Sequence, residues 1–136
     1  QSSTCARRRL IAARTPFARA GTDLKDLDAI DLAGVASAEA VARSGIDPAE
    51  IDLLVAGIVV APLHAPNLGR EVVFRAALPE SIPGTTVNLA CASSNRAITT
   101  GAESILLGHA EVVLAGGAES LSNVPFAFSR SAAEKY

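Results

Sequence analysis

The sequence contains few aromatic residues and little sulfur: its 136 residues include no tryptophan, no methionine and one tyrosine. A core built from aromatic rings is therefore excluded, and the many alanines favour small-residue helices that pack closely on a sheet. The two cysteines, Cys5 and Cys91, lie far apart in the chain. That spacing excludes a disulfide framework and fits a free thiol in a reducing compartment. The length fits one domain.

Charge and hydropathy exclude two further classes of function. The formal net charge is −2, from 12 basic and 14 acidic residues, and no basic stripe is present. We therefore expect no nucleic-acid partner. No apolar run approaches the roughly 20 residues that cross a bilayer, so we expect no membrane span.

Periodic apolar residues, separated by glycine and proline, predict alternating strands and helices. The expected elements are strands at 8–13, 53–60, 85–89 and 111–115, helices at 28–43, 67–77 and 92–107, and a capped turn at 47–50. Gly45 and Gly108 should end two helices, Gly116-Gly117 should form a tight turn, and 129–136 should be a frayed tail. The alternation predicts an α/β fold with a mainly parallel mixed sheet that carries helices on its faces.

Cys91 lies where the strand at 85–89 gives way to the helix at 92–107. The partial positive charge at a helix N-terminus favours a thiolate, which is a nucleophile suited to taking an acyl group. A buried structural cysteine is the alternative interpretation, and the local sequence leaves both open. If the thiol is reactive, the backbone N–H groups of Ala92 and Ser93 are candidate donors to an oxyanion. Ser93 and Ser94 are expected to cap the helix.

Four motifs in order resemble the N-terminal half of a thiolase. They are RTPF at 14–17, NLGR at 67–70, VNLACASS at 87–94 and AGGAESLSNVP at 115–125. The resemblance extends from about residue 8 to about residue 130. Two positions depart from the family pattern: Ser94 stands where many thiolases have glycine, and Leu121 stands where many have methionine. Neither change removes a reactive group.

The resemblance implies a thiolase N-terminal domain and an acyltransferase activity, with Cys91 as the catalytic nucleophile. Thiolases cleave a 3-ketoacyl-CoA with coenzyme A, or condense two acyl-CoA molecules, through an acyl-cysteine intermediate. Coenzyme A and acyl-CoA are then substrates, and no metal or other cofactor is implied. Thiolases are much longer than this chain, and their second half supplies a Gly-His-Pro histidine and a second cysteine. His64 and His109 lie in no such motif, so we expect a fragment that is inactive alone.

The same resemblance sets expectations for organisation and partners. Residues 1–7 should be a leader or an added remnant, 8–125 part of the thiolase N-terminal domain, and 126–136 a tail or the start of a further loop domain. The strand at 85–89 should lie at a subunit contact, which predicts a homodimer or tetramer. The expected location is the cytoplasm, or an organelle matrix in a eukaryote.

Two alternatives stay open beside the thiolase interpretation. A ketosynthase-like condensing enzyme shares the fold and the cysteine position, and a non-catalytic dimerisation remnant would need no complete site. For several other polar residues, structural or surface roles are preferred over catalytic ones. Asn88 should make a strand-end hydrogen bond, with orientation of the turn before Cys91 as the alternative, and Glu119 should be structural. Arg70 and Arg96 should be structural, with contacts to coenzyme A phosphates as the alternative, and His64 and His109 should be surface residues.

Overall fold

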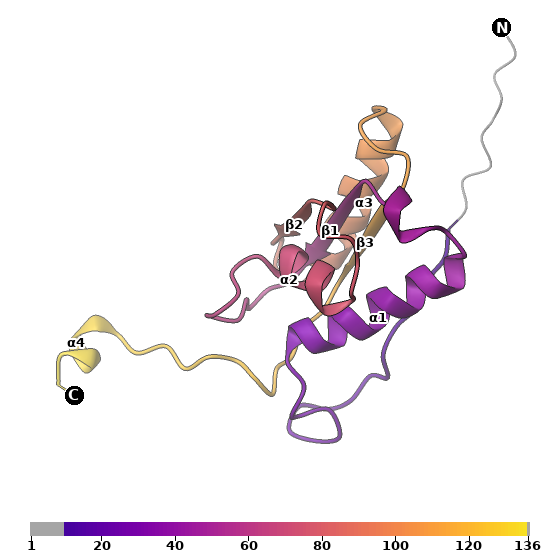
Figure 1. The fold of residues 1–136 in the computed structure, drawn as a ribbon. Coiled ribbons are helices and arrows are strands. Elements are labelled where there is room, and N and C mark those ends of the chain that lie inside the picture. The colour runs from indigo at the N-terminus through magenta and orange to yellow at the C-terminus, as the bar shows by residue number, and fades with distance from the viewer. Residues whose placement is uncertain (1–9, 136) are drawn as a thin grey trace, which may run out of the picture.

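The computed structural model describes residues 10–135, and these form a parallel sheet with helices on both faces (Figure 1). The helices are α1 (Ala29–Ser44), α2 (Leu68–Arg75), α3 (Ser93–Leu106) and the short α4 (Arg130–Ala133), with the 3₁₀ turn η1 (Pro48–Glu50). The strands are β1 (Leu53–Gly57), β2 (Gly84–Val87) and β3 (Val113–Gly117), in the order β2-β1-β3. Both strand pairs are parallel, so the predicted α/β fold is confirmed.

Strand β1 is the centre of the molecule because its alternate residues face two different helical layers. Leu54, Ala56 and Ile58 belong to the buried apolar cluster that includes residues of α1 and α2. Val55 and Gly57 point the other way, and the backbone at the start of α3 lies directly against Gly57. With both faces covered, an almost wholly apolar strand is the expected sequence.

Local signals fix the ends of α1. The Asp28 side chain accepts a hydrogen bond from Asp31 N at 2.9 Å, and Asp31 in turn accepts one from Asp28 N at 3.3 Å, which is a capping box. Gly45 ends the helix with φ 68°. Asp31 also accepts a hydrogen bond from Arg75 Nε at 2.8 Å, and this bond is the main cause that lowers the pKa of Asp31. The pair links α1 to the end of α2.

Glycines allow the helices to approach the strands closely. A Cβ added at Gly57 would lie 2.6 Å from Ser94 N, and one at Gly101 would lie 2.8 Å from Val113 Cγ1. On the other face, a Cβ at Gly69 would lie 2.7 Å from Thr85 N. These contacts bring both α2 and α3 onto the backbone of the sheet, as the alanine-rich composition predicts.

Several expected elements differ from the structure. Residues 10–13 form no strand: Leu10 is 89% exposed, and no strand of the described chain lies beside this segment to complete its hydrogen bonds. The expected positions 8 and 9, like the expected leader at 1–7, lie outside the described residues. Gly116 and Gly117 are not a turn but the end of β3, in register with Ala56 and Gly57. The segment expected to be a frayed tail contains α4, capped by Ser129.

Most other helices and strands begin and end within one to three residues of their predicted bounds. Helices α1, α2 and α3 lie within a residue or two of their predicted ranges, and Gly108 follows α3 with φ 74°. Strands β1 and β2 end earlier than predicted, at Gly57 and Val87. The chain leaves both strands early because the segments after them turn to form the carboxyl edge of the sheet.

Two glycines in neighbouring strands provide a matched test of the contact between α3 and the sheet. Gly57→Ala should destabilise the fold by about 1–3 kcal/mol, because the new methyl group overlaps the backbone of Ser93 and Ser94. Gly116→Ala is the control, since a Cβ there would meet nothing within 4 Å. Urea unfolding should therefore separate the two variants, and equal midpoints would contradict the close contact.

Asp52 joins the start of β1 to the start of β3. Its carboxylate accepts hydrogen bonds from Glu111 N at 2.7 Å and Val112 N at 3.1 Å. These two bonds, first that of Glu111 and then that of Val112, hold the pKa of Asp52 below its ordinary value of 3.8. The carboxylate thus satisfies two backbone donors that precede β3.

The sign of the pH dependence follows from this lowered pKa. The stability that Asp52 contributes is present above pH 3.8 and is lost as the pH falls toward its folded-state pKa. Asp52→Asn should lower the urea midpoint at pH 7 and flatten the fall in stability below about pH 5. Asp23→Asn, at an exposed position before α1, is the control. Parallel pH profiles for wild type and Asp52→Asn would refute this role.

Candidate active site

Cys91 lies in the connection between β2 and α3, at the carboxyl edge of the sheet, and it is exposed. The carboxyl edge is where ligands bind in open α/β sheets. A cavity of about 290 Å³ lies beside the thiol. Its walls come from the ends of β1 and β3 and from the first turn of α3, and they include Gly57, Val59, Ser94, Gly117 and Glu119. The alternative of a buried structural cysteine is therefore wrong.

The turn that carries Cys91 has an unusual backbone held by Ser93. Ala90 has φ 46°, in the left-handed region that costs a non-glycine residue about 1–2 kcal/mol. The Ser93 hydroxyl accepts a hydrogen bond from Leu89 N at 2.9 Å and donates one to Ala90 O at 2.6 Å. Ser93 is only 3% exposed. The hydroxyl thus closes the turn from inside and leaves Cys91 on its outer side.

Two backbone predictions at this turn are wrong. Ala92 N and Ser93 N donate to Leu89 O and Ala90 O, so neither is available to an oxyanion. Helix α3 also has no side-chain cap, because Ser93 is engaged with the turn before it. Within residues 10–135, the N–H groups of Cys91, Ser94 and Asn95 meet no acceptor. These three groups, of which those of Cys91 and Ser94 belong to residues that line the cavity, are the donors left free at the start of α3.

Asn88 and Glu119 both bond to the segment that follows β1. Asn88 Nδ2 donates to Val59 O at 2.9 Å, as the predicted strand-end hydrogen bond, and its Oδ1 also accepts from Ala90 N at 3.0 Å. Glu119 accepts hydrogen bonds from Val59 N and Val60 N. The structural interpretation of Glu119 is therefore confirmed, since its carboxylate is occupied by backbone donors.

The basic residues singled out in the sequence lie away from Cys91 or are engaged elsewhere. Arg70 donates to Glu80 O and Ile82 O, and its guanidinium lies 4.3 Å from the Phe74 ring centroid. Arg96 pairs with Glu103 on the surface of α3. The two histidines are exposed, as expected: His109 follows α3, and His64 lies 3.8 Å from Asp28.

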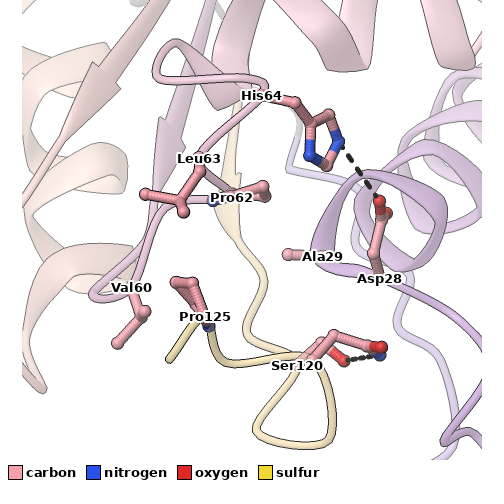
Figure 2. Close-up of a pocket in the computed structure, with 9 residues that line it drawn as sticks. Asp28, Ala29, Val60, Pro62, Leu63, His64, Ser120 and Pro125 are labelled. Atoms are coloured by element: carbon pink, nitrogen blue, oxygen red, sulfur yellow. Dashed lines mark hydrogen bonds and ion pairs between the residues drawn. The ribbon is translucent and has the colours of Figure 1, made fainter. Parts of the chain in front are cut away.

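A second cavity, of about 360 Å³, lies beside the N-terminus of α1 and is lined by Asp28, His64, Ser120 and Pro125 among others (Figure 2). Although it is larger, its lining does not include Cys91. The polar groups on its wall bond to protein: Ser120 Oγ donates to Leu27 O, and Asn123 Nδ2 donates to Ser120 Oγ. We therefore take the smaller cavity, which holds the nucleophile, as the candidate active site.

Two other features, a metal-binding cluster and a membrane-spanning helix, are absent from the described part of the chain. Between residues 10 and 135, no group of three or more His, Cys, Asp or Glu residues is arranged to hold a metal ion. Among the helices in that range, none combines the length and hydropathy of a membrane span. Cys5 lies outside the described residues.

Sequence reasoning located Cys91 but missed the partners that shape its turn. The sequence gives only a weak indication that the Ser93 hydroxyl points inward, namely a serine two residues after the cysteine. The bonds from Glu119 to Val59 and Val60 join residues about 60 apart in sequence, and no local pattern indicates them.

Comparison with known proteins places this arrangement in a family. Residues 10–136 match the family model described as "Thiolase, N-terminal domain". The chain is 40% identical over 121 residues to a probable 3-ketoacyl-CoA thiolase of Caenorhabditis elegans, covering 89% of this chain and 27% of that protein. It is 43% identical over 120 residues to a 3-ketoacyl-CoA thiolase of Photorhabdus laumondii, covering 88% of this chain and 28% of that protein.

The comparison with solved structures supports the same family. The acetyl-CoA acetyltransferase of Bacillus anthracis superposes with a TM-score of 0.86 at 34% identity, covering 89% of this chain and 31% of that one. A thiolase of Ascaris suum, in complex with coenzyme A, superposes with a TM-score of 0.85 at 36% identity, covering 88% and 31%. These matches favour a thiolase over a ketosynthase-like enzyme. The chain spans little more than a quarter of the length of its curated relatives, and it belongs to the thiolase family, through that family's N-terminal domain.

Proposed function

We propose that this chain supplies the acyl-accepting nucleophile of a thiolase, and that the nucleophile is Cys91. The single observation that carries the proposal is the position of the thiol: exposed, at the N-terminal end of α3, beside a cavity at the carboxyl edge of the sheet. The names of the thiolase relatives support an acyl-CoA substrate.

In the proposed reaction, the Cys91 thiolate attacks the 3-keto carbon of a 3-ketoacyl-CoA. A bond forms between Sγ and that carbon, and the bond between carbons 2 and 3 breaks. Acetyl-CoA leaves as its enolate and takes up a proton. Coenzyme A then attacks the acyl-cysteine, which releases a shortened acyl-CoA and restores the thiolate. The reverse sequence condenses two acyl-CoA molecules, and neither direction needs a metal or redox cofactor.

The free N–H groups at the start of α3 provide electrostatic support for this chemistry. Attack on a carbonyl places negative charge on its oxygen, and preorganised donors at that point lower the barrier. Cys91 N and Ser94 N are free for this role, whereas Ala92 N and Ser93 N are engaged. A proton donor and a base must come from outside residues 10–135, because the described histidines lie away from the thiol. We therefore expect acylation of Cys91 by this chain alone, without turnover.

The proposal includes partners and location. We expect a homodimer or tetramer that uses the segment around β2, since β2 is an edge of the sheet and its outer side has no partner within the described chain. The proposed location is the cytoplasm, or an organelle matrix in a eukaryote. No observation favours a purely structural dimerisation role over acyl transfer.

Acylation of Cys91 is the direct test of the proposed function. Incubation with acetyl-CoA should place one acetyl group on Cys91, found by peptide mass spectrometry, with release of one coenzyme A thiol. The rate should exceed that of the same cysteine in the urea-unfolded chain by about tenfold or more, because the preorganised free N–H groups are lost on unfolding.

Two controls make this test specific. Cys91→Ser should abolish the acetylated peptide while leaving the unfolding midpoint nearly unchanged, since the side chain is exposed. Cys5 provides a second thiol in the same sample. Equal acetylation of Cys5 and Cys91, or equal rates in the folded and unfolded chain, would overturn the proposal.

A further inference from the structure

The carboxyl ends of β1 and β3 are joined by the carboxylate of Glu119. One oxygen accepts a hydrogen bond from Val59 N at 2.8 Å, and the other accepts one from Val60 N at 3.2 Å. Hydrogen bonds to an ionised carboxylate are roughly twice as strong as neutral ones. Because Ala118 N, directly after β3, also donates to Gly57 O at the end of β1 at 3.1 Å, the segment after β1 is fixed on its β3 side.

The same segment is fixed on its β2 side by Asn88. The side-chain amide donates to Val59 O at 2.9 Å, and its oxygen accepts from Ala90 N at 3.0 Å. Asn88 therefore spans the gap between the end of β1 and the residue before the nucleophile. Val59 is the shared member, since its N–H bonds to Glu119 and its carbonyl bonds to Asn88.

Resting on the proposed function, we propose that Asn88 and Glu119 are positioning residues for Cys91. Glu119 fixes Val59, and Val59 orients the Asn88 amide, whose oxygen holds Ala90 N and so sets the turn that presents the thiol. This positioning network consists of Glu119, Val59, Asn88 and Ala90. It lies on the wall of the Cys91 cavity, to which Val59, Ala90 and Glu119 all contribute.

The conformation of Ala90 explains why the turn needs such support. A left-handed φ of 46° at a non-glycine residue persists only where the surroundings hold it. Ser93 holds the carbonyl of Ala90 from inside, and Asn88 holds its N–H from outside. Loss of the outer bond leaves one constraint in place of two. The turn then relaxes, and the thiol moves relative to the free N–H groups.

The hydrogen bonds that Glu119 accepts indicate that it positions neighbouring residues and does not act as a base. Both of its carboxylate oxygens accept backbone hydrogen bonds, and a proton taken from a substrate would remove the negative charge that strengthens them. Acyl transfer is sensitive to placement, since a displacement of about 1 Å can lower a rate by up to a hundredfold. Alkylation by a small reagent needs only an accessible thiolate. The two reactions therefore separate positioning from reactivity.

The experiment compares Asn88→Ala and Glu119→Ala with wild type by three measurements. Amide hydrogen exchange of Ala90, followed by NMR, reports whether the network is coupled. Acetylation by acetyl-CoA and alkylation by iodoacetamide report placement and accessibility of Cys91. Asn123→Ala is the matched control, because its amide also bonds to backbone carbonyls, those of Lys25 and Leu27, but away from the Cys91 cavity.

We expect Glu119→Ala to speed the exchange of Ala90 N–H about tenfold, although Glu119 does not contact Ala90, because one hydrogen bond in the network is lost. Acetylation should fall about tenfold in both variants while alkylation stays within about threefold. Glu119→Gln keeps one acceptor and should rescue part of both effects. In Asn123→Ala, the Ala90 exchange and the ratio of acetylation to alkylation should match wild type.

The contrary outcomes are distinct. If Ala90 exchange is unchanged in Glu119→Ala, or if acetylation and alkylation fall together as the variants unfold, the positioning role is refuted. If wild type takes no acetyl group but Glu119→Ala still speeds Ala90 exchange, the proposed function fails and the positioning of the thiol stands. The double variant Asn88→Ala/Glu119→Ala should lower the acetylation rate no further than either single substitution, because the effects of substitutions within one network are not additive.

Discussion

The contact between the first turn of α3 and the backbone of the central strands determines where the Cys91 thiol lies. Gly57 and Gly117, paired across β1 and β3, have no side chains. The backbone of Ser93 and Ser94 occupies the space that a Cβ at Gly57 would fill, and the Ser94 side chain occupies the space at Gly117. A helix that rests this low on the sheet must begin at its carboxyl edge. Cys91 precedes that helix and is therefore held at the edge, next to the helix N-terminus.

This close packing has a consequence for backbone hydrogen bonding at the edge. Three chain segments leave the sheet together, and each carries N–H and C=O groups that no strand pairs with. Polar side chains satisfy many of them: Ser93 bonds within the nucleophile turn, Asn88 bonds between β2 and β1, and Glu119 bonds between β3 and β1. Within the described residues, the N–H groups of Cys91, Ser94 and Asn95 have no acceptor, and they lie where the proposed acyl transfer would need donors.

The features predicted well from sequence are those with local causes. Asp28 and Gly45 mark the ends of α1 by their own side-chain chemistry and conformational freedom, and the apolar run of β1 identifies a strand covered on both faces. The strand predicted at 10–13 is absent because a strand needs a neighbouring strand to complete its hydrogen bonds. A short apolar run carries no information about whether that neighbour exists. Gly116 and Gly117 were assigned to a turn because glycine marks close approach and turning alike, and only the partner helix distinguishes the two.

In the candidate site, too, features with local causes could be predicted and those that depend on distant segments could not. Position 91 could be predicted because a strand and a helix meet there, but the direction of the Ser93 hydroxyl and the bonds of Glu119 depend on segments brought together by the fold. Those long-range bonds are also the ones that restrain the nucleophile. A chain in which Cys91 is retained but the carboxyl edge is not held together would keep the thiol and lose its alignment with the free N–H groups. The reactivity proposed for this cysteine thus depends on the folded edge and not on the motif alone.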